Sequence, residues 1–341
     1  MKFLIVGPSW VGDAVMAQCL YKTLKSKYKN SELDVLSPDW SKDILLRMKE
    51  VSNTISSPFL HGELRINERI KLGRDLKTHK YDQAFVLTNS FKSALVPFCA
   101  NIKKRTGWLG EYRYILLNDI RRLNKKEHPM MVQRFVALAS DKGKLPNKLP
   151  TPQLVYEQDN LESLAVKHDF KIDVPTIALC PGAEFGPAKR WPSDYYSKVA
   201  SEYLQKEWQV FLLGSLNDSR VGSEIEEKIS HKLRRNLLNL TGKTKLVDVV
   251  DLLSFVDIIL TNDSGLMHIG ASVNTPLVAL FGPSSPEFTP PLSKQAIVLR
   301  KEKGYIKTRI GSLPGGYHKS LVDLQPAEVI QTLNNINIQS E

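Results

Sequence analysis

Short apolar runs alternate with longer helical patterns along the first 100 residues. FLIV, ELDVLS and YDQAFVLTN are each followed by such a pattern, and the first pattern predicts a helix from about Gly12 to Tyr28. Strands of about four to eight residues separated by helices are typical of βαβ units, which build a parallel sheet. This half of the chain therefore predicts a doubly wound α/β domain.

The alternation begins again in the second half. A predicted helix, MVQRFVALASDKG, leads into KLPNKLPTPQLVY, whose three prolines indicate a linker. The predicted strands TIALCPG, WQVFLLGS, DIILTND and TPLVALFG then alternate with helical patterns, and QPAEVIQTLNNI predicts a closing helix. We expect an α/β protein with two Rossmann-like domains, 1–155 and 156–325, facing a central cleft, and a C-terminal helix at 326–341. Ligands of such sheets bind beyond the carboxyl ends of the strands.

The charge is distributed unevenly between the two halves. The formal net charge is +11, and residues 1–150 carry 27 Lys and Arg against 14 Asp and Glu, whereas residues 151–341 carry 20 against 22. Residues 103–126 are the densest part, with eight basic side chains against Glu111 and Asp119. Such a segment is either a solvated basic face or a surface for nucleic acid, an anionic membrane or a phosphorylated substrate.

Composition narrows the cellular context. No stretch reaches about 18 apolar residues without a charge, so no membrane-spanning helix is expected. The apolar start, Phe3 to Val6, is too short for a signal peptide and predicts a buried strand. The three cysteines, Cys19, Cys99 and Cys180, have neither metal-ligand spacing nor a disulfide pattern, which favours a reducing cytoplasm.

Four predicted strand-to-helix turns are rich in Gly, Ser and Asp: GPSWVGD, CPGAEFGPAKRWP, LLGSLND and TNDSGLMH. A helix start entered through glycine exposes backbone N–H groups and a partial positive charge, which together bind phosphate. Three such turns in the second half favour a nucleotide or nucleotide-sugar there. The dinucleotide fingerprint, the P-loop and the Asp-x-Asp metal clamp are all absent from the sequence. We therefore expect no metal or other cofactor, and expect amines such as Lys189 and helix ends to stabilise a leaving diphosphate.

Together, GPSWVGD, CPGAEFGPAKRWP, TNDSGLMH and FGPSSPEFTPP resemble the bacterial heptosyltransferase II family, within glycosyltransferase family 9. The resemblance covers nearly the whole chain, and SWVGD favours this family over heptosyltransferase I. It implies a GT-B fold whose C-terminal domain holds most of the donor. It also implies inverting, metal-independent transfer of L-glycero-D-manno-heptose from ADP-heptose to the first heptose of heptosyl-Kdo-lipid A.

The resemblance also implies residue roles. Asp13 matches the general base; it is the one carboxylate in the first thirty residues and follows a Gly turn. Lys189 matches the lysine that meets the donor's phosphates. The donor-binding set is Gly182, Glu184, Lys189, Gly214, Ser215, Asp218, Thr244, Asp263, Ser264, Gly265 and His268. The predicted acceptor-binding set is Ser9, Trp10 and Gly12 of the first turn, with Arg105, Arg113, Arg121 and Arg122 taken from the basic segment for their charge.

The implied acceptor is polyanionic and lies at the cytoplasmic face of the inner membrane, so the basic first half is expected to attract it electrostatically and to hold the enzyme there peripherally. The residues leave two other functional hypotheses open. One is a different GT-B nucleotide-sugar enzyme, such as heptosyltransferase I, another hexosyltransferase or an epimerase. The other is a basic binding module for nucleic acid or membrane, although nucleic-acid motifs are absent from the basic segment and no nucleic-acid partner is expected.

Overall fold

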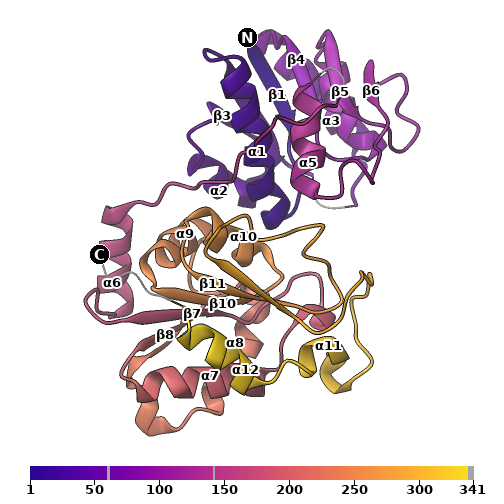
Figure 1. Ribbon diagram of the computed structural model, residues 1–341. Coiled ribbons are helices and arrows are strands. Elements are labelled where there is room, and N and C mark those ends of the chain that lie inside the picture. The colour runs from indigo at the N-terminus through magenta and orange to yellow at the C-terminus, as the bar shows by residue number, and fades with distance from the viewer. Residues whose placement is uncertain (60–61, 141–142, 337–341) are drawn as a thin grey trace. The chain divides into compact units, whose positions relative to one another are not determined.

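The structure, a computed structural model, describes residues 1–59, 62–140 and 143–336. The chain forms two compact units, Met1–Gln153 and the remainder from Leu154 (Figure 1). They divide within residues 143–157, which contain neither helix nor strand. In the described ranges, no helix combines the length and the apolar character that crossing a bilayer requires.

The described part of the first unit contains one parallel sheet of six strands, in the order β3-β2-β1-β4-β5-β6. Its strands are β1 (Lys2–Val6), β2 (Glu32–Pro38), β3 (Asn53–Ser57), β4 (Gln83–Val86), β5 (Lys104–Trp108) and β6 (Asp119–Arg121). Its helices are α1 (Val11–Lys27), α2 (Lys42–Leu46), α3 (Ile66–Leu76), α4 (Leu95–Cys99) and α5 (Met131–Val136). Helix α1 packs against α5, and α3 packs against α4.

Over its described residues, the second unit repeats this architecture. Six parallel strands follow the order β12-β11-β10-β7-β8-β9. They are β7 (Thr176–Cys180), β8 (Gln209–Leu212), β9 (Leu237–Asn239), β10 (Ile258–Asn262), β11 (Leu277–Phe281) and β12 (Ala296–Arg300). The helices are α6 (Gln158–His168), α7 (Ser193–Gln205), α8 (Ser219–Glu227), α9 (Leu246–Phe255), α10 (Gly265–Ser272), α11 (Lys319–Val322) and α12 (Pro326–Asn334). Figure 1 shows α9 and α10 on one face of this sheet and α7, α8 and α12 on the other.

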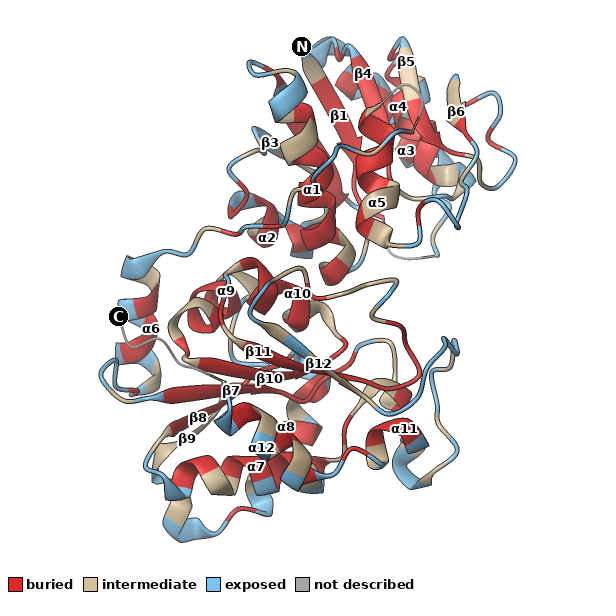
Figure 2. Ribbon diagram, in the orientation of Figure 1, coloured by how far each residue is buried: buried red, intermediate tan, exposed pale blue. Residues whose placement is uncertain are grey.

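Both sheets therefore have the same doubly wound order, with the first and fourth strands of each unit side by side at the centre. The central strands are buried along almost their whole length (Figure 2). Because successive connections leave in opposite directions at β1/β4 and at β7/β10, the loops there part and leave a crevice for a ligand. The topology points to these two positions, one in each unit, as binding sites.

The predicted α/β class and the two doubly wound domains are confirmed. The long apolar runs became central strands, because a parallel strand covered by helices on both faces needs apolar residues at every position. Strands β3, β5, β6, β9 and β12 were not predicted, and most of them lie toward the sheet edges; all except β12 (AIVLR) are shorter or more polar than the central strands. Edge strands bury less, so their sequences carry less of the apolar signal.

The predicted helix MVQRFVALASDKG is shorter than expected. Helix α5 ends at Val136, a 3-10 turn follows, and Ser140 is extended; residues 141–142 lie outside the described ranges. The guanidinium of Arg121 donates hydrogen bonds to the carbonyls of Ala137 and Ser140. These carbonyls are satisfied by a neighbouring strand, so the helix need not continue.

One buried amide organises the second unit's central edge. Asn262, the last residue of β10, is fully buried, and its Oδ1 accepts from the Trp191 N–H and the Tyr196 hydroxyl, both at 3.1 Å. Its Nδ2 donates to the Pro181 carbonyl at 2.8 Å. This side chain thus ties the end of β10 to the turn after β7 and to the start of α7.

We predict that Asn262→Ala lowers the free energy of unfolding by about 2–4 kcal/mol, because the buried Trp191 N–H loses its acceptor and the Pro181 carbonyl loses its donor, and each unsatisfied group costs about 1–3 kcal/mol. Urea unfolding followed by tryptophan fluorescence measures the change. Asn335→Ala, at an exposed position of the same unit, is the matched control and should shift stability by under about 0.5 kcal/mol. Equal stability of the two variants would contradict a stabilising role for the Asn262 hydrogen bonds.

Candidate active site

The first unit has a cavity of about 520 Å³ at the carboxyl ends of its central strands. Val6 of β1, Leu36 and Ser37 of β2, and Leu87 just after β4 line its base. The cavity therefore lies at the β1/β4 switch point, where the topology places a ligand.

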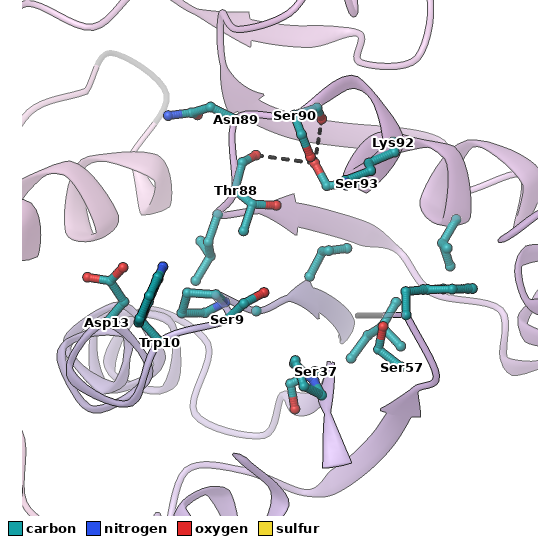
Figure 3. A pocket seen from close by; sticks show the side chains of 18 of the residues that line it. Ser9, Trp10, Asp13, Ser37, Ser57, Thr88, Asn89, Ser90, Lys92 and Ser93 are labelled. Atoms are coloured by element: carbon teal, nitrogen blue, oxygen red, sulfur yellow. Dashed lines mark hydrogen bonds between the residues drawn. The ribbon is translucent and has the colours of Figure 1, made fainter. Parts of the chain in front are cut away.

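Asp13 lines this cavity from the first turn of α1, together with Ser9 and Trp10 of the preceding turn. Figure 3 shows Trp10 and Asp13 side by side at the helix start, with Thr88 and Asn89 on another wall. A carboxylate here interacts favourably with the positive end of the helix dipole. An ionised carboxylate is the form that accepts a proton from a hydroxyl group. The predicted Gly12 is buried within α1.

Several cavity residues were not identified from the sequence. Asn89, Ser90 and Lys92 follow β4, and Glu111 and Arg134 come from later segments. The signal available was TNS directly after the run YDQAFVL, because polar residues after a central strand lie at the same sheet edge as Ser9. Three basic residues line the cavity, Arg69, Lys92 and Arg134, and the guanidinium groups of the two arginines also donate to backbone carbonyls.

Arg113 was predicted to bind the acceptor, but its side chain is 0% exposed. Its guanidinium donates to the carbonyls of Thr88 and Trp108, at 2.6 and 2.5 Å, and to the Asn89 side-chain oxygen at 3.2 Å. Burial lowers its pKa to about 10, so it stays charged at neutral pH. Arg113 therefore braces the loop after β4 from inside and has no surface left for an acceptor.

Arg121 is also buried, which corrects its prediction as an acceptor residue. Its guanidinium lies 3.0 Å from the Asp119 carboxylate and also donates to the carbonyls of Ala137 and Ser140, which follow α5. Arg105 is half-buried and donates to the carbonyls of Leu116 and Ile102, at 2.6 and 2.5 Å. Of the four predicted arginines, Arg122 is the exposed one. Much of the basic segment's charge is thus used inside the fold.

In the second unit, the turns after β7 and β10 meet through an ion pair. Lys189 Nζ lies 2.5 Å from Asp263 Oδ2, and the lysine keeps about a fifth of its side-chain surface exposed while the aspartate is buried. The same ammonium lies 5.4 Å from the ring centroid of Phe185. The ammonium is therefore held in one place at the sheet edge, directly before the start of α10 at Ser264.

The predicted Gly182, Gly214, Ser215 and Asp218 come together beside this pair. The Asp218 carboxylate is buried and accepts from the Ser215 N–H and hydroxyl, at 2.9 and 2.8 Å. A Cβ at Gly182 would lie 2.4 Å from that carboxylate, so only glycine fits. Arg190 reaches Asp218 at 3.4 Å. Asp218, predicted as a donor-binding residue, here holds two Gly turns together.

The remaining predicted donor residues are more dispersed. Glu184 is exposed and accepts from the Asn217 side chain at 3.4 Å. Ser264 and Gly265 begin α10 and are partly exposed. The Thr244 hydroxyl is buried and has no hydrogen-bond partner among the described residues, which makes it a candidate for a ligand contact.

Comparison with known proteins identifies the family. The family model "Glycosyltransferase family 9 (heptosyltransferase)" matches residues 69–318, more than half of the chain. The chain belongs to glycosyltransferase family 9. This family 9 enzyme is 48% identical to lipopolysaccharide heptosyltransferase 2 of Escherichia coli K12 over the full length of both chains. It is 46% identical to lipooligosaccharide heptosyltransferase 2 of Haemophilus influenzae, with 98% of this chain and 99% of that protein covered.

A solved structure agrees. The structure titled ADP-heptose lps heptosyltransferase II, from E. coli, matches with a TM-score of 0.91 and 45% identity, covering 98% of each chain. The resemblance found in the sequence is thereby confirmed, as are the GT-B fold and the glycosyltransferase activity. No group of three or more His, Cys, Asp or Glu within residues 1–59, 62–140 and 143–336 is placed to hold a metal ion.

His268 of this family 9 glycosyltransferase is buried in α10, near both Asp263 and Lys189. Burial lowers its pKa from 6.5 to about 4, and the opposing effects of Asp263 and Lys189 are smaller. The imidazole is therefore neutral in the folded protein at neutral pH. In that form, one ring nitrogen can donate a hydrogen bond and the other can accept one.

We predict a stability loss at mild acid that depends on His268. The unfolded chain takes up a proton below pH 6.5 and the folded one only near pH 4, so stability is complete above pH 6.5 and falls as the pH drops. Between pH 7 and 5 the imidazole contributes a loss of about 2 kcal/mol. His268→Gln should remove that part of the change in urea midpoint. His231→Gln, at an exposed position, should keep it; identical profiles for the two variants would contradict the assignment.

Proposed function

We propose that this enzyme transfers L-glycero-D-manno-heptose from ADP-heptose to the first heptose of heptosyl-Kdo-lipid A, in the inner core of lipopolysaccharide. The observation that carries the proposal is the full-length identity of 48% to a protein named lipopolysaccharide heptosyltransferase 2. The two switch-point sites support it, because a transferase needs one place for a donor diphosphate and another for an acceptor hydroxyl.

The donor's diphosphate binds in the second unit, at the edge formed by Lys189 and the start of α10. An ammonium and the N-terminal N–H groups of a helix both stabilise phosphate oxygens. Asp263 holds the ammonium until the donor arrives. The Thr244 hydroxyl supplies a further hydrogen bond to the nucleotide. No metal ion or other cofactor takes part, because the lysine and helix start neutralise the leaving group.

The acceptor sugar occupies the first unit's cavity, with Asp13 as general base. The acceptor hydroxyl oxygen attacks the anomeric carbon, its proton passes to the Asp13 carboxylate, and the bond from the anomeric carbon to the ADP oxygen breaks. A single displacement inverts the anomeric configuration. Lys92 and Arg134 in the cavity wall suit the anionic sugars next to the accepting heptose. The enzyme works in the cytoplasm and associates peripherally with the inner membrane, where the acceptor is anchored.

The direct test is to incubate the purified protein with ADP-heptose and a mono-heptosylated acceptor and to identify the product by mass. We expect addition of one heptose and release of ADP. A preference for a UDP-hexose, or transfer to an acceptor that carries no heptose, would instead identify another GT-B nucleotide-sugar enzyme. The first outcome concerns the donor and the second concerns the acceptor, so the donor and the acceptor are exchanged in separate assays.

We predict that Asp13→Asn lowers kcat by a factor on the order of 10² or more, because the amide cannot accept the proton. ADP affinity should not change, since the donor's phosphates bind in the other unit. Asp75→Asn, an exposed carboxylate of the same unit, is the matched control and should keep full activity. Turnover near the normal rate in Asp13→Asn would overturn the assignment of the base.

We also predict that activity survives dialysis against EDTA, because Lys189 and the α10 start neutralise the leaving diphosphate. Initial rates with and without chelator should agree within a factor of about two. Complete loss of activity, restored by magnesium or manganese, would show that a metal ion carries that charge instead.

A further inference from the structure

The connection between β5 and β6, residues 109–118, exposes a cluster of large apolar side chains. Tyr112 is 90% exposed, Tyr114 57% and Ile115 80%. Single exposed apolar residues are ordinary on protein surfaces, but neighbouring ones that remain solvent-exposed mark an interaction site. We call Tyr112, Tyr114 and Ile115 the apolar tip.

The apolar tip is held outward by the residues between and after it. Arg113, between the two tyrosines, is buried and bound to carbonyls of two other segments. Leu116 and Leu117 are buried in the core of the first unit. Tyr112 has a φ of 32°, a left-handed conformation that costs free energy for a tyrosine. The chain therefore presents these side chains to solvent in a fixed arrangement.

Neighbouring segments extend the apolar surface. Glu111 Oε2 accepts from the Phe91 N–H at 2.9 Å, which places the half-exposed Phe91 beside the start of the tip. Arg105, bonded to the Leu116 carbonyl, lies 5.3 Å from the ring centroid of Phe98, which is 40% exposed. Aromatic rings thus lie at both ends of the tip.

Exposed cations flank this connection along the chain. Lys103, Arg122, Lys125 and Lys126 of the same basic segment are exposed. The Asn118 side chain donates to the Lys103 carbonyl at 2.7 Å and so places that lysine at the end of the connection. Lys104, the remaining basic residue of the segment besides the internal arginines, lies 3.7 Å from the Asp119 carboxylate.

We propose that the apolar tip inserts into the interface of an anionic lipid bilayer while the flanking cations contact lipid headgroups; this rests on the proposed function, whose acceptor is anchored in a membrane. Tyrosine is enriched at membrane interfaces because its ring is apolar and its hydroxyl is polar. Basic side chains near an anionic leaflet add attraction. The apolar tip thus matches the apolar side of the bilayer interface, and the cations match its anionic headgroups.

The insertion also places the catalytic unit. Glu111 lines the cavity that holds Asp13, and it directly precedes Tyr112. A tip seated in the bilayer interface therefore brings the cavity rim to the headgroup layer, within reach of a sugar that projects from a lipid. The membrane contact and the acceptor site are coupled by adjacent residues of one rigid connection.

A second copy of the chain fits this surface less well. A symmetric contact brings the same patch of each copy together, so the four exposed cations would meet their equivalents. Like charges across an interface are repelled. A nucleic acid would use the tyrosines for stacking but leave Ile115 without a partner.

The test is sedimentation with vesicles of phosphatidylcholine, alone or mixed with phosphatidylglycerol. We expect the wild-type enzyme to bind the anionic vesicles and Tyr112→Ser/Ile115→Ser to bind them at least about tenfold more weakly. Lys125→Gln/Lys126→Gln should weaken binding and reduce its salt dependence. Val166→Ser, at an exposed apolar position of the second unit, is the matched control and should bind normally. Thermal unfolding verifies that each variant is folded.

Transfer assays separate this inference from the proposed function. The tip variant should retain wild-type turnover on a water-soluble acceptor fragment and lose it on acceptor embedded in vesicles. If vesicle binding is lost in the tip variant but no heptose is transferred by any form, the membrane contact stands and the proposed reaction fails. Equal vesicle binding by the wild type and the tip variant overturns the inference. It is also overturned if the wild type forms a dimer or an RNA complex that the tip substitutions abolish.

Discussion

The contact between the Asn262 amide and the turn after β7 determines the geometry of the second unit's site. The amide binds the Pro181 carbonyl and the Trp191 N–H, and these flank the segment that contains Lys189. Asp263 follows Asn262 directly in the chain. The ion pair between Lys189 and Asp263 therefore results from a neutral, buried hydrogen-bond network next to it. A buried amide serves well here because both its oxygen and its nitrogen are fully used, which avoids the penalty for an unpaired polar group.

In the first unit, a buried cation fixes the loops at the corresponding edge of the sheet. Arg113 reaches from the connection after β5 to the loop after β4 and fixes the cavity wall that Thr88 and Asn89 form. In both units, then, a long-range polar group at the carboxyl ends of the central strands makes two loops into one rigid edge. Loops braced in this way can keep binding groups positioned before a substrate arrives. The same brace directs Tyr112 and Tyr114 outward.

Much of the fold could be predicted from the sequence, and part of the site. The apolar runs and the Gly-rich turns indicated the central strands and the helix starts, because parallel strands bring their carboxyl ends to one edge. The pairing of Lys189 with Asp263 was not predicted, although both residues were. The burial of Arg113 and Arg121 was missed because it depends on partners far away in the chain, and a run of basic residues looks the same whether it is solvated or internal. The strand β5, KRTGW, was missed for the related reason that its charges obscure its apolar residues.

In the proposed reaction, the ammonium of Lys189 held by Asp263 is the binding group for the donor's phosphates. Isothermal titration of ADP into Lys189→Gln tests this role, with Lys198→Gln in α7 as the control. We expect the first substitution to weaken ADP binding at least about tenfold, the loss of one charge-assisted hydrogen bond, and the second to leave it unchanged. ADP affinity that is equal in the two variants, accompanied by lower stability of Lys189→Gln alone, would show that the lysine serves only to neutralise Asp263.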